Sequence, residues 1–196
     1  MRIVHPVAGE IEFDTLRDVI VRGKRAGWAS GREPNNLPNG VKNYSYVDSE
    51  ARLGYKDNFR GEQGFIGQEV VETMEGIPIW GMNYDDVFRV PDEFTPDMAK
   101  GFRKEAFSFL KQKLMQVPTE FPFRGPLGQS DLVNTSFGII MYEHWISNCG
   151  SPDEALRECG GEEDIHLFHS NGTVRATPFQ FSYRARLLVP DAYVVK

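Results

Sequence analysis

Two tight-turn signals constrain this sequence more than any other feature. Asn171-Gly172 and Glu75-Gly76 each separate two strand-like runs, one pair in each half of the chain. Glycine after a short polar or acidic residue allows the positive φ of a hairpin turn, and strands joined by such a turn pair antiparallel. We therefore predict strands at 65–73, 77–84, 164–169 and 173–188.

Further strands and three helices complete the predicted order. Additional strands are expected at 44–47, 53–55 and 136–146. Thr95-Pro96-Asp97 is the clearest helix start, because Thr can cap, Pro is tolerated at the first position and an acid suits the helix dipole. A first helix is predicted from about Thr15 to Arg25 with Asp14 as its cap, and a short one over 151–156 that ends near Gly160-Gly161.

Strands grouped into two blocks, each preceded by a helix, predict an α+β fold rather than a wound parallel sheet. We expect residues 1–196 to form one compact domain with pseudo-halves at about 1–92 and 93–196. The second half weakly echoes the first, as a divergent internal repeat would. Pro178 is expected at a bulge or at a sheet edge.

Composition excludes several partner classes. The 196 residues carry a formal net charge of −6, mixed along the chain, with no basic stripe for nucleic acid. No apolar run approaches the ~20 residues that span a bilayer, and the N-terminus lacks a sustained signal segment. Two cysteines do not make a disulfide scaffold. We expect a cytoplasmic protein with reduced thiols and without a nucleic-acid or membrane partner.

One strand carries the sharpest functional candidate. Alternation places Phe65, Gly67, Glu69 and Val71 on one face, so Glu69 is flanked by apolar residues. Glu69 could pair with Asp57 of a neighbouring strand as a carboxylate site, or it could be a buried structural group with an Arg, Lys or amide partner.

The next strand alternates in the same way. Pro78, Trp80, Met82 and Tyr84 are expected to share a face, as an aromatic wall for a ligand or as core beneath a helix. Asn83 is expected to point the other way.

Motifs for cofactors and nucleophiles are scarce. His166-x-x-His169 is spaced so that the two rings diverge on a strand, and Arg60-Gly61-Glu62-Gln63-Gly64 lacks the Lys and the helix of a phosphate loop. Neither Cys149 nor Cys159 has a recognisable activating setting. We expect no metal and no cofactor.

A signature spans the first β block: Tyr55-x-Asp57, Phe59-x-Gly61, Phe65-x-Gly67-Gln68-Glu69-x-Val71 and Gly76-x-Pro78-x-Trp80-x-Met82-Asn83-Tyr84. It resembles a family of bacterial domains of unknown function. The resemblance implies a fold whose second half is a worn copy of the first, with traces here at Glu163-x-Ile165 and Tyr183. Residues 146–162 look like an insertion, and Arg184-Ala185-Arg186 departs from the pattern.

Such relatives can follow a helix-turn-helix segment, which implies a sensor or partner-binding role. The expected function is a non-catalytic binding module of regulatory or toxin-neutralising type, whose partner is another protein, a small ligand or a second copy of the chain. The alternative is a small hydrolase or isomerase that uses Asp57 and Glu69. The candidate binding residues are Tyr55, Asp57, Glu69, Trp80, Asn83 and Tyr84.

Overall fold

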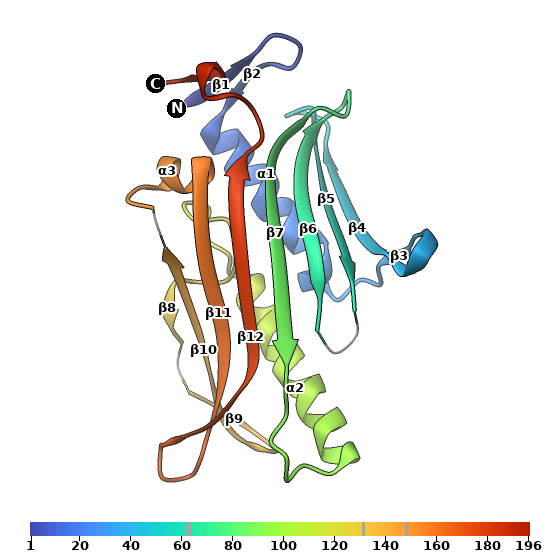
Figure 1. Ribbon diagram of the computed structural model, residues 1–196, viewed down its shortest axis with the longest axis vertical. Helices are drawn as coiled ribbons and strands as arrows, with labels where there is room; N and C mark the ends of the chain where they lie inside the picture. The colour runs from blue at the N-terminus through green and yellow to red at the C-terminus, as the bar shows by residue number, and fades with distance from the viewer. Residues whose placement is uncertain (62–63, 131, 148) are drawn as a thin grey trace.

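The computed structural model describes residues 1–61, 64–130, 132–147 and 149–196, so Glu62 and Gln63 of the glycine-rich segment lie outside the described residues. Ten of the described strands form one antiparallel sheet, in the order β3-β4-β5-β6-β7-β12-β11-β10-β8, with β9 paired to β10. Helices α1 (Phe13–Ala26) and α2 (Pro96–Leu114) both lie on the same side of this sheet (Figure 1). The fold is therefore α+β, as predicted.

The strand bounds of the large sheet follow. They are β3 (Asn35–Asn36), β4 (Lys42–Asp48), β5 (Leu53–Arg60), β6 (Ile66–Thr73), β7 (Pro78–Phe88), β8 (Gly128–Gln129), β9 (Val133–Thr135), β10 (Gly138–Ser147), β11 (Glu158–Phe168) and β12 (Val174–Leu187). A small sheet of β1 (Arg2–His5), β2 (Gly9–Glu12) and β13 (Val194–Val195) joins the two termini at one end of the molecule (Figure 1). Short helices are η1 (Trp28–Ser30), η2 (Pro38–Gly40), α3 (Pro152–Arg157) and η3 (Asp191–Tyr193).

Local sequence signals explain most of these elements. Gly76 and Gly172 adopt φ values of 82° in their turns, and β6 pairs with β7 and β11 with β12 as antiparallel hairpins. Thr95 caps α2 by accepting a hydrogen bond from the Met98 backbone N–H, and Ser151 caps α3 in the same way. The predicted hairpins and both of these helix starts are confirmed.

The two predicted β blocks form one continuous sheet. Strand β7 pairs with β12 at its centre, where Tyr84 lies opposite Tyr183. Outward from this pair, β6 and β5 follow on one side and β11 and β10 on the other. Tyr84 also lies opposite Gly67, and Tyr183 lies opposite Gly161. The strand order outward from the central pair, and the Tyr–Gly register, are thus the same in both halves, as expected for an internal repeat.

Several local predictions are wrong. Asp14 lies in the first turn of α1, whose N-cap is Glu12 without a side-chain hydrogen bond. Strand β11 begins at Glu158, so Gly160 and Gly161 lie within a strand instead of after a helix. Pro178 lies at a register irregularity of β12, as the bulge prediction had it, but β12 is a central strand and not an edge. Residues 146–147 and 158–162 of the segment predicted as an insertion lie in strands β10 and β11.

None of the helices in the described residues is long and apolar enough to span a bilayer.

Candidate ligand pocket

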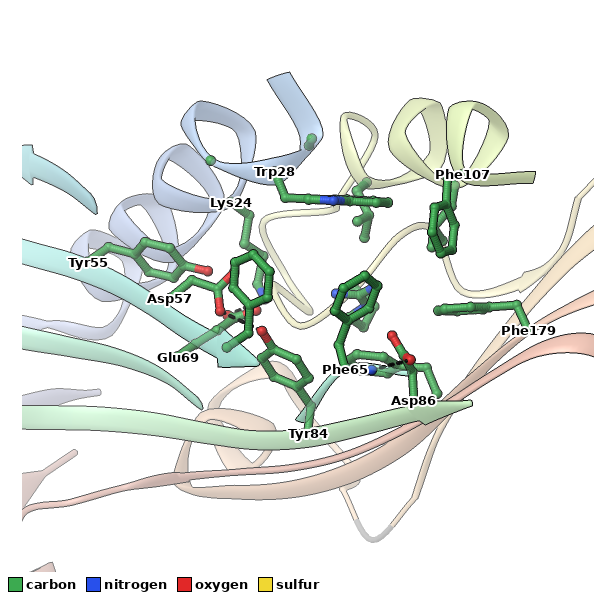
Figure 2. A pocket seen from close by; sticks show the side chains of 17 residues that line it. Lys24, Trp28, Tyr55, Asp57, Phe65, Glu69, Tyr84, Asp86, Phe107 and Phe179 are labelled. Atoms are coloured by element: carbon green, nitrogen blue, oxygen red, sulfur yellow. Dashed lines mark hydrogen bonds and ion pairs between the residues drawn. The ribbon is translucent and has the colours of Figure 1, made fainter. Parts of the chain in front are cut away.

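A pocket opens between the inner face of the sheet and the helices that cover it (Figure 2). It measures about 630 Å³ with the open solvent at its mouth, of which about 60 Å³ can hold the centre of a water molecule. Ordinary small-molecule sites span about 300–1,000 Å³, and the 60 Å³ open to the centre of a water molecule falls below that range, so the pocket suits only a small, slender ligand. The lining residues are Lys24, Gly27, Trp28, Ala29, Tyr55, Asp57, Phe59, Phe65, Glu69, Tyr84, Asp86, Phe107, Leu110, Leu114, Arg124, Phe179 and Phe181.

Aromatic rings form most of the wall. Trp28 of η1 and Phe107 of α2 meet edge to face with 5.9 Å between ring centroids, and both are half-buried. Phe65 lies 6.1 Å from Phe107, and Phe179 and Phe181 of β12 stack at 6.2 Å. Figure 2 shows Phe65, Phe107 and Phe179 on the side of the pocket away from Asp57 and Glu69, with Asp86 beside Phe65. A ligand in this space would contact π faces on several sides.

Lys24 and Glu69 form a buried ion pair at the other end of the pocket. The Lys24 ammonium donates to Glu69 Oε2, and the two residues are 7% and 2% exposed. Burial lowers the pKa of Lys24 below its ordinary value, while the charge of Glu69 opposes this shift. Glu69 thus has the internal cationic partner that its apolar strand face demands.

Arg124 and Glu163 form a second buried ion pair in the other half of the sheet. Arg124 Nε and Nη2 donate to Glu163 Oε2 at 2.8 and 2.6 Å. The Tyr142 hydroxyl donates to the other oxygen, Glu163 Oε1, at 2.8 Å. Both oxygens of Glu163 are therefore occupied.

Asp57 differs from these paired groups. The Tyr84 hydroxyl donates to Asp57 Oδ1 at 2.6 Å, but within the described part of the chain no Lys, Arg or His forms an ion pair with Asp57. Burial, and after it the charge of Glu69, raises the pKa of Asp57 to about 7. Asp57 is half-buried and lies directly opposite Glu69 in the β5–β6 register.

Asp86 is the second lining carboxyl without an ion pair in the described residues. Its Oδ1 accepts the backbone N–H of Phe65 at 2.6 Å, and the Asp86 N–H donates in turn to the Phe65 carbonyl at 2.8 Å. Burial raises the pKa of Asp86 to about 7. Asp86 thereby fixes the backbone where β6 begins.

Two glycines permit this arrangement. A Cβ at Gly67 would lie 2.5 Å from the Tyr84 ring, so only glycine lets that ring lie flat across β6 and reach Asp57. A Cβ at Gly23 would lie 2.3 Å from the Tyr55 ring, so glycine also sets the close approach of α1 that delivers Lys24.

Four of the six predicted site residues line the pocket, namely Tyr55, Asp57, Glu69 and Tyr84. The other two do not. Trp80 is fully buried with its ring 6.2 Å from Phe123, and its Nε1 has no hydrogen-bond partner among the described residues. Asn83 is exposed on the outer face and accepts a hydrogen bond from Gln68 at 3.1 Å.

Sequence reasoning missed the residues that the helices and the loop after α2 contribute. No sequence pattern in these segments marks a functional residue. The lining residues missed in this way include Lys24, Trp28, Phe107 and Arg124. One signal in the sequence is that Glu69, on an apolar strand face, needs a cationic partner. The sequence does not say which Lys or Arg is that partner.

Other reactive groups are engaged elsewhere. His166 bonds Thr177 Oγ1 at 3.1 Å and Glu143 Oε2 at 3.0 Å on the outer face. Cys149 and Cys159 are free thiols with 3.4 Å between their sulfurs, and burial raises the pKa of Cys159.

Comparison with known proteins supports a family of unknown function. A family model described as "Domain of unknown function (DUF5680)" matches residues 57–132, which run from β5 through the loop after α2. No curated protein and no solved structure matches the chain.

Proposed function

We propose that this protein is a non-catalytic binding module that holds a small organic ligand in the pocket between its sheet and helices. The observation that carries the proposal is a concave aromatic lining joined to buried carboxyls that lack an ion-pair partner in the described residues. A few polar groups in a mostly apolar cavity are typical of small-molecule sites. A concave site of this size suits a small molecule better than a protein partner.

Glu69 has a structural part in this proposal. Its carboxylate is bound by Lys24 inside the fold, so it is not free to act on a ligand. The pair holds α1 against β6 and so forms the floor of the pocket. Ligand recognition then falls to the neighbouring Asp57, with the Tyr84 hydroxyl as its positioning group.

A ligand-observed NMR screen of a fragment library of mixed charge tests the proposal. We expect hits that compete with one another for one site. Ala29→Trp places a large ring in the pocket lining and should abolish them, and Phe107→Ala, which removes a half-buried wall ring, should weaken them. Circular dichroism checks that each variant folds. An absence of hits, or hits that both variants retain unchanged, would contradict the proposed function.

The enzyme alternative is favoured by one observation, the pKa of about 7 for Asp57 beside the Tyr84 hydroxyl, since a general base works best near ambient pH. With Glu69 engaged by Lys24, Asp57 would act alone as the base of an isomerase. Incubating the fragment hits in D₂O and following deuterium incorporation by NMR tests this: incorporation that Asp57→Asn abolishes would support catalysis.

A further inference from the structure

We infer that the ligand is an organic cation, a protonated amine on a small aromatic or apolar body, and that Asp57 binds its ammonium group. The inference rests on the proposed function, because it names the chemical class that the same pocket accepts.

Charge balance inside the pocket is the first argument. Lys24 neutralises Glu69, and Arg124 neutralises Glu163. The two lining carboxyls that remain, Asp57 and Asp86, have no ion pair with any described residue. A buried carboxylate is costly without a countercharge, so a cation that enters the pocket is stabilised and an anion is not.

Exposure favours Asp57 over Asp86 as the anchor. Asp86 is 9% exposed, and its Oδ1 accepts the Phe65 backbone N–H that holds the start of β6. Asp57 is half-buried and receives one hydrogen bond, from Tyr84, at Oδ1. No hydrogen bond from a described residue reaches its other oxygen, Oδ2, which can accept from an ammonium donor.

The rings of the wall suit a cation as well. Arg124 Cζ already lies 3.9 Å from the centroid of Phe181, and Lys111 Nζ lies 5.0 Å from that of Trp28. These contacts show rings of this pocket in cation–π geometry. Two basic groups, Lys111 and Arg103, lie beside the lining rings Trp28 and Phe107 and repel an entering cation. Their charges are half-exposed, so salt screens them more than it screens the charge of Asp57 inside the pocket.

Both lining cations are unsuited to binding an anion. The Lys24 ammonium is directed at Glu69, and Arg124 directs Nε and Nη2 at Glu163. A carboxylate ligand would compete with Glu69 or Glu163 for these cations and would lie close to the Asp57 carboxylate.

Ionisation of Asp57 makes the affinity depend on pH. The groups that face it are Lys24 from α1, Tyr44 from β4, Tyr55 from its own strand β5, Glu69 from β6, Tyr84 from β7 and Arg124 from the loop after α2. A cation prefers the ionised carboxylate, so its binding should strengthen from pH 5.5 to pH 8 and release a proton from Asp57 at neutral pH.

Three probes of nearly equal size test the inference by isothermal titration calorimetry: 2-phenylethylammonium, 2-phenylethanol and 3-phenylpropionate. At pH 8 we expect the ammonium probe to bind at least about tenfold more tightly than either of the others, a preference within reach of one desolvated charge pair. Asp57→Asn should remove this preference and leave the affinity for 2-phenylethanol within about twofold.

The matched control is Asp85→Asn. Asp85 lies on the same central strand as Tyr84 but faces outward, exposed, where Ser182 donates to it at 2.9 Å. The Asp85→Asn substitution removes the same charge without touching the pocket. This variant should therefore still bind the ammonium probe more tightly than the other two probes. If Asp57→Asn does not fold, the affinity of the wild-type protein between pH 5.5 and pH 8 serves instead and should rise at least about tenfold for the ammonium probe alone.

Equal or tighter binding of 2-phenylethanol or 3-phenylpropionate would overturn the cation and leave the proposed binding function standing. Ammonium binding that persists in Asp57→Asn would overturn Asp57 as the anchor. Failure of all three probes would also overturn the inference, and the fragment screen with Ala29→Trp then decides separately whether the pocket binds small ligands at all.

Discussion

At the scale of single residues, the most informative contrast is between Asp57 and Glu69. They lie directly opposite each other on β5 and β6. Glu69 has the buried Lys24 ammonium as its partner, whereas Asp57 has the Tyr84 hydroxyl. Glu69 therefore stabilises the fold at neutral pH, while ionised Asp57 costs stability. Substituting each by its amide should change stability in opposite directions.

Glu69→Gln should lower the free energy of unfolding by about 3 kcal/mol at pH 7, because it leaves the Lys24 ammonium buried without its countercharge. Urea unfolding measures the loss. The double variant Lys24→Met/Glu69→Met removes both charges and should lose less than Glu69→Gln alone. A Glu69→Gln protein as stable as the wild type would contradict a structural Glu69.

Asp57→Asn should raise the free energy of unfolding at pH 8 by about 1–2 kcal/mol, a gain typical of replacing a functional group. The pKa of Asp57 is about 7 in the fold, above its unfolded value, so the folded protein holds a proton that the unfolded chain releases. The gain should thus nearly vanish at pH 5. Urea unfolding at the two pH values decides it, and a variant less stable than the wild type at pH 8 would speak against an uncompensated Asp57.

At the scale of elements, the contact between α1 and the sheet sets the pocket floor. Gly23→Ala would ordinarily stabilise a helix by about 1 kcal/mol. Here the new Cβ would lie 2.3 Å from Tyr55, so we expect a loss of about 1–3 kcal/mol. Thermal unfolding measures it, with exposed Ser108→Ala of α2 as the neutral control. A stabilised Gly23→Ala protein would show that α1 can move away without cost.

Sequence patterns predict the elements better than the site. The period-2 pattern of β6 and β7 correctly places Glu69 and Tyr84 on the buried face, because alternation is a local property. The start of β11 is missed, since Gly160-Gly161 resembles a helix end. Position 161 of this strand is glycine because a Cβ there would lie 2.4 Å from the Tyr183 hydroxyl, a contact between distant segments.

The pocket is hidden from sequence for the same reason. Lys24 and Arg124 lie 45 and 39 residues from their carboxylate partners, and nothing local marks them as partners. The strand pattern singles out Asp57 together with Glu69, but the Lys24 contact that distinguishes the two carboxyls is tertiary.

At the scale of the whole molecule, the two halves share a strand order and register, but they differ in the residue that lies opposite the buried, paired glutamate. Asp57 lies opposite Glu69, and at the corresponding place His144 lies opposite Glu163. Both nitrogens of His144 are hydrogen-bonded, to the Gly125 carbonyl at 2.9 Å and the Tyr183 hydroxyl at 3.0 Å. Burial lowers the pKa of His144, so it is neutral where Asp57 can be charged. This difference is the reason why we propose that the first half binds the ligand's charge.

Overall stability should fall as pH rises from 5 to 8. Asp57 and Asp86 have pKa values raised to about 7, and that of Asp164 on the outer face is raised to about 6. Each holds a proton in the fold that the unfolded chain has lost, so its stabilising effect disappears through this range. Urea unfolding at several pH values should show the decline, and Asp57→Asn/Asp86→Asn should flatten most of it. An equal decline in that variant would assign the effect to other groups.

The most direct test of the whole account is a crystal structure of the protein soaked with 2-phenylethylammonium at pH 8. The account predicts the ring among Trp28, Phe65 and Phe179, with the ammonium nitrogen within hydrogen-bond distance of the Asp57 carboxylate. A pocket that holds only water while the probe binds elsewhere, or a probe whose ammonium points out through the mouth, would contradict it.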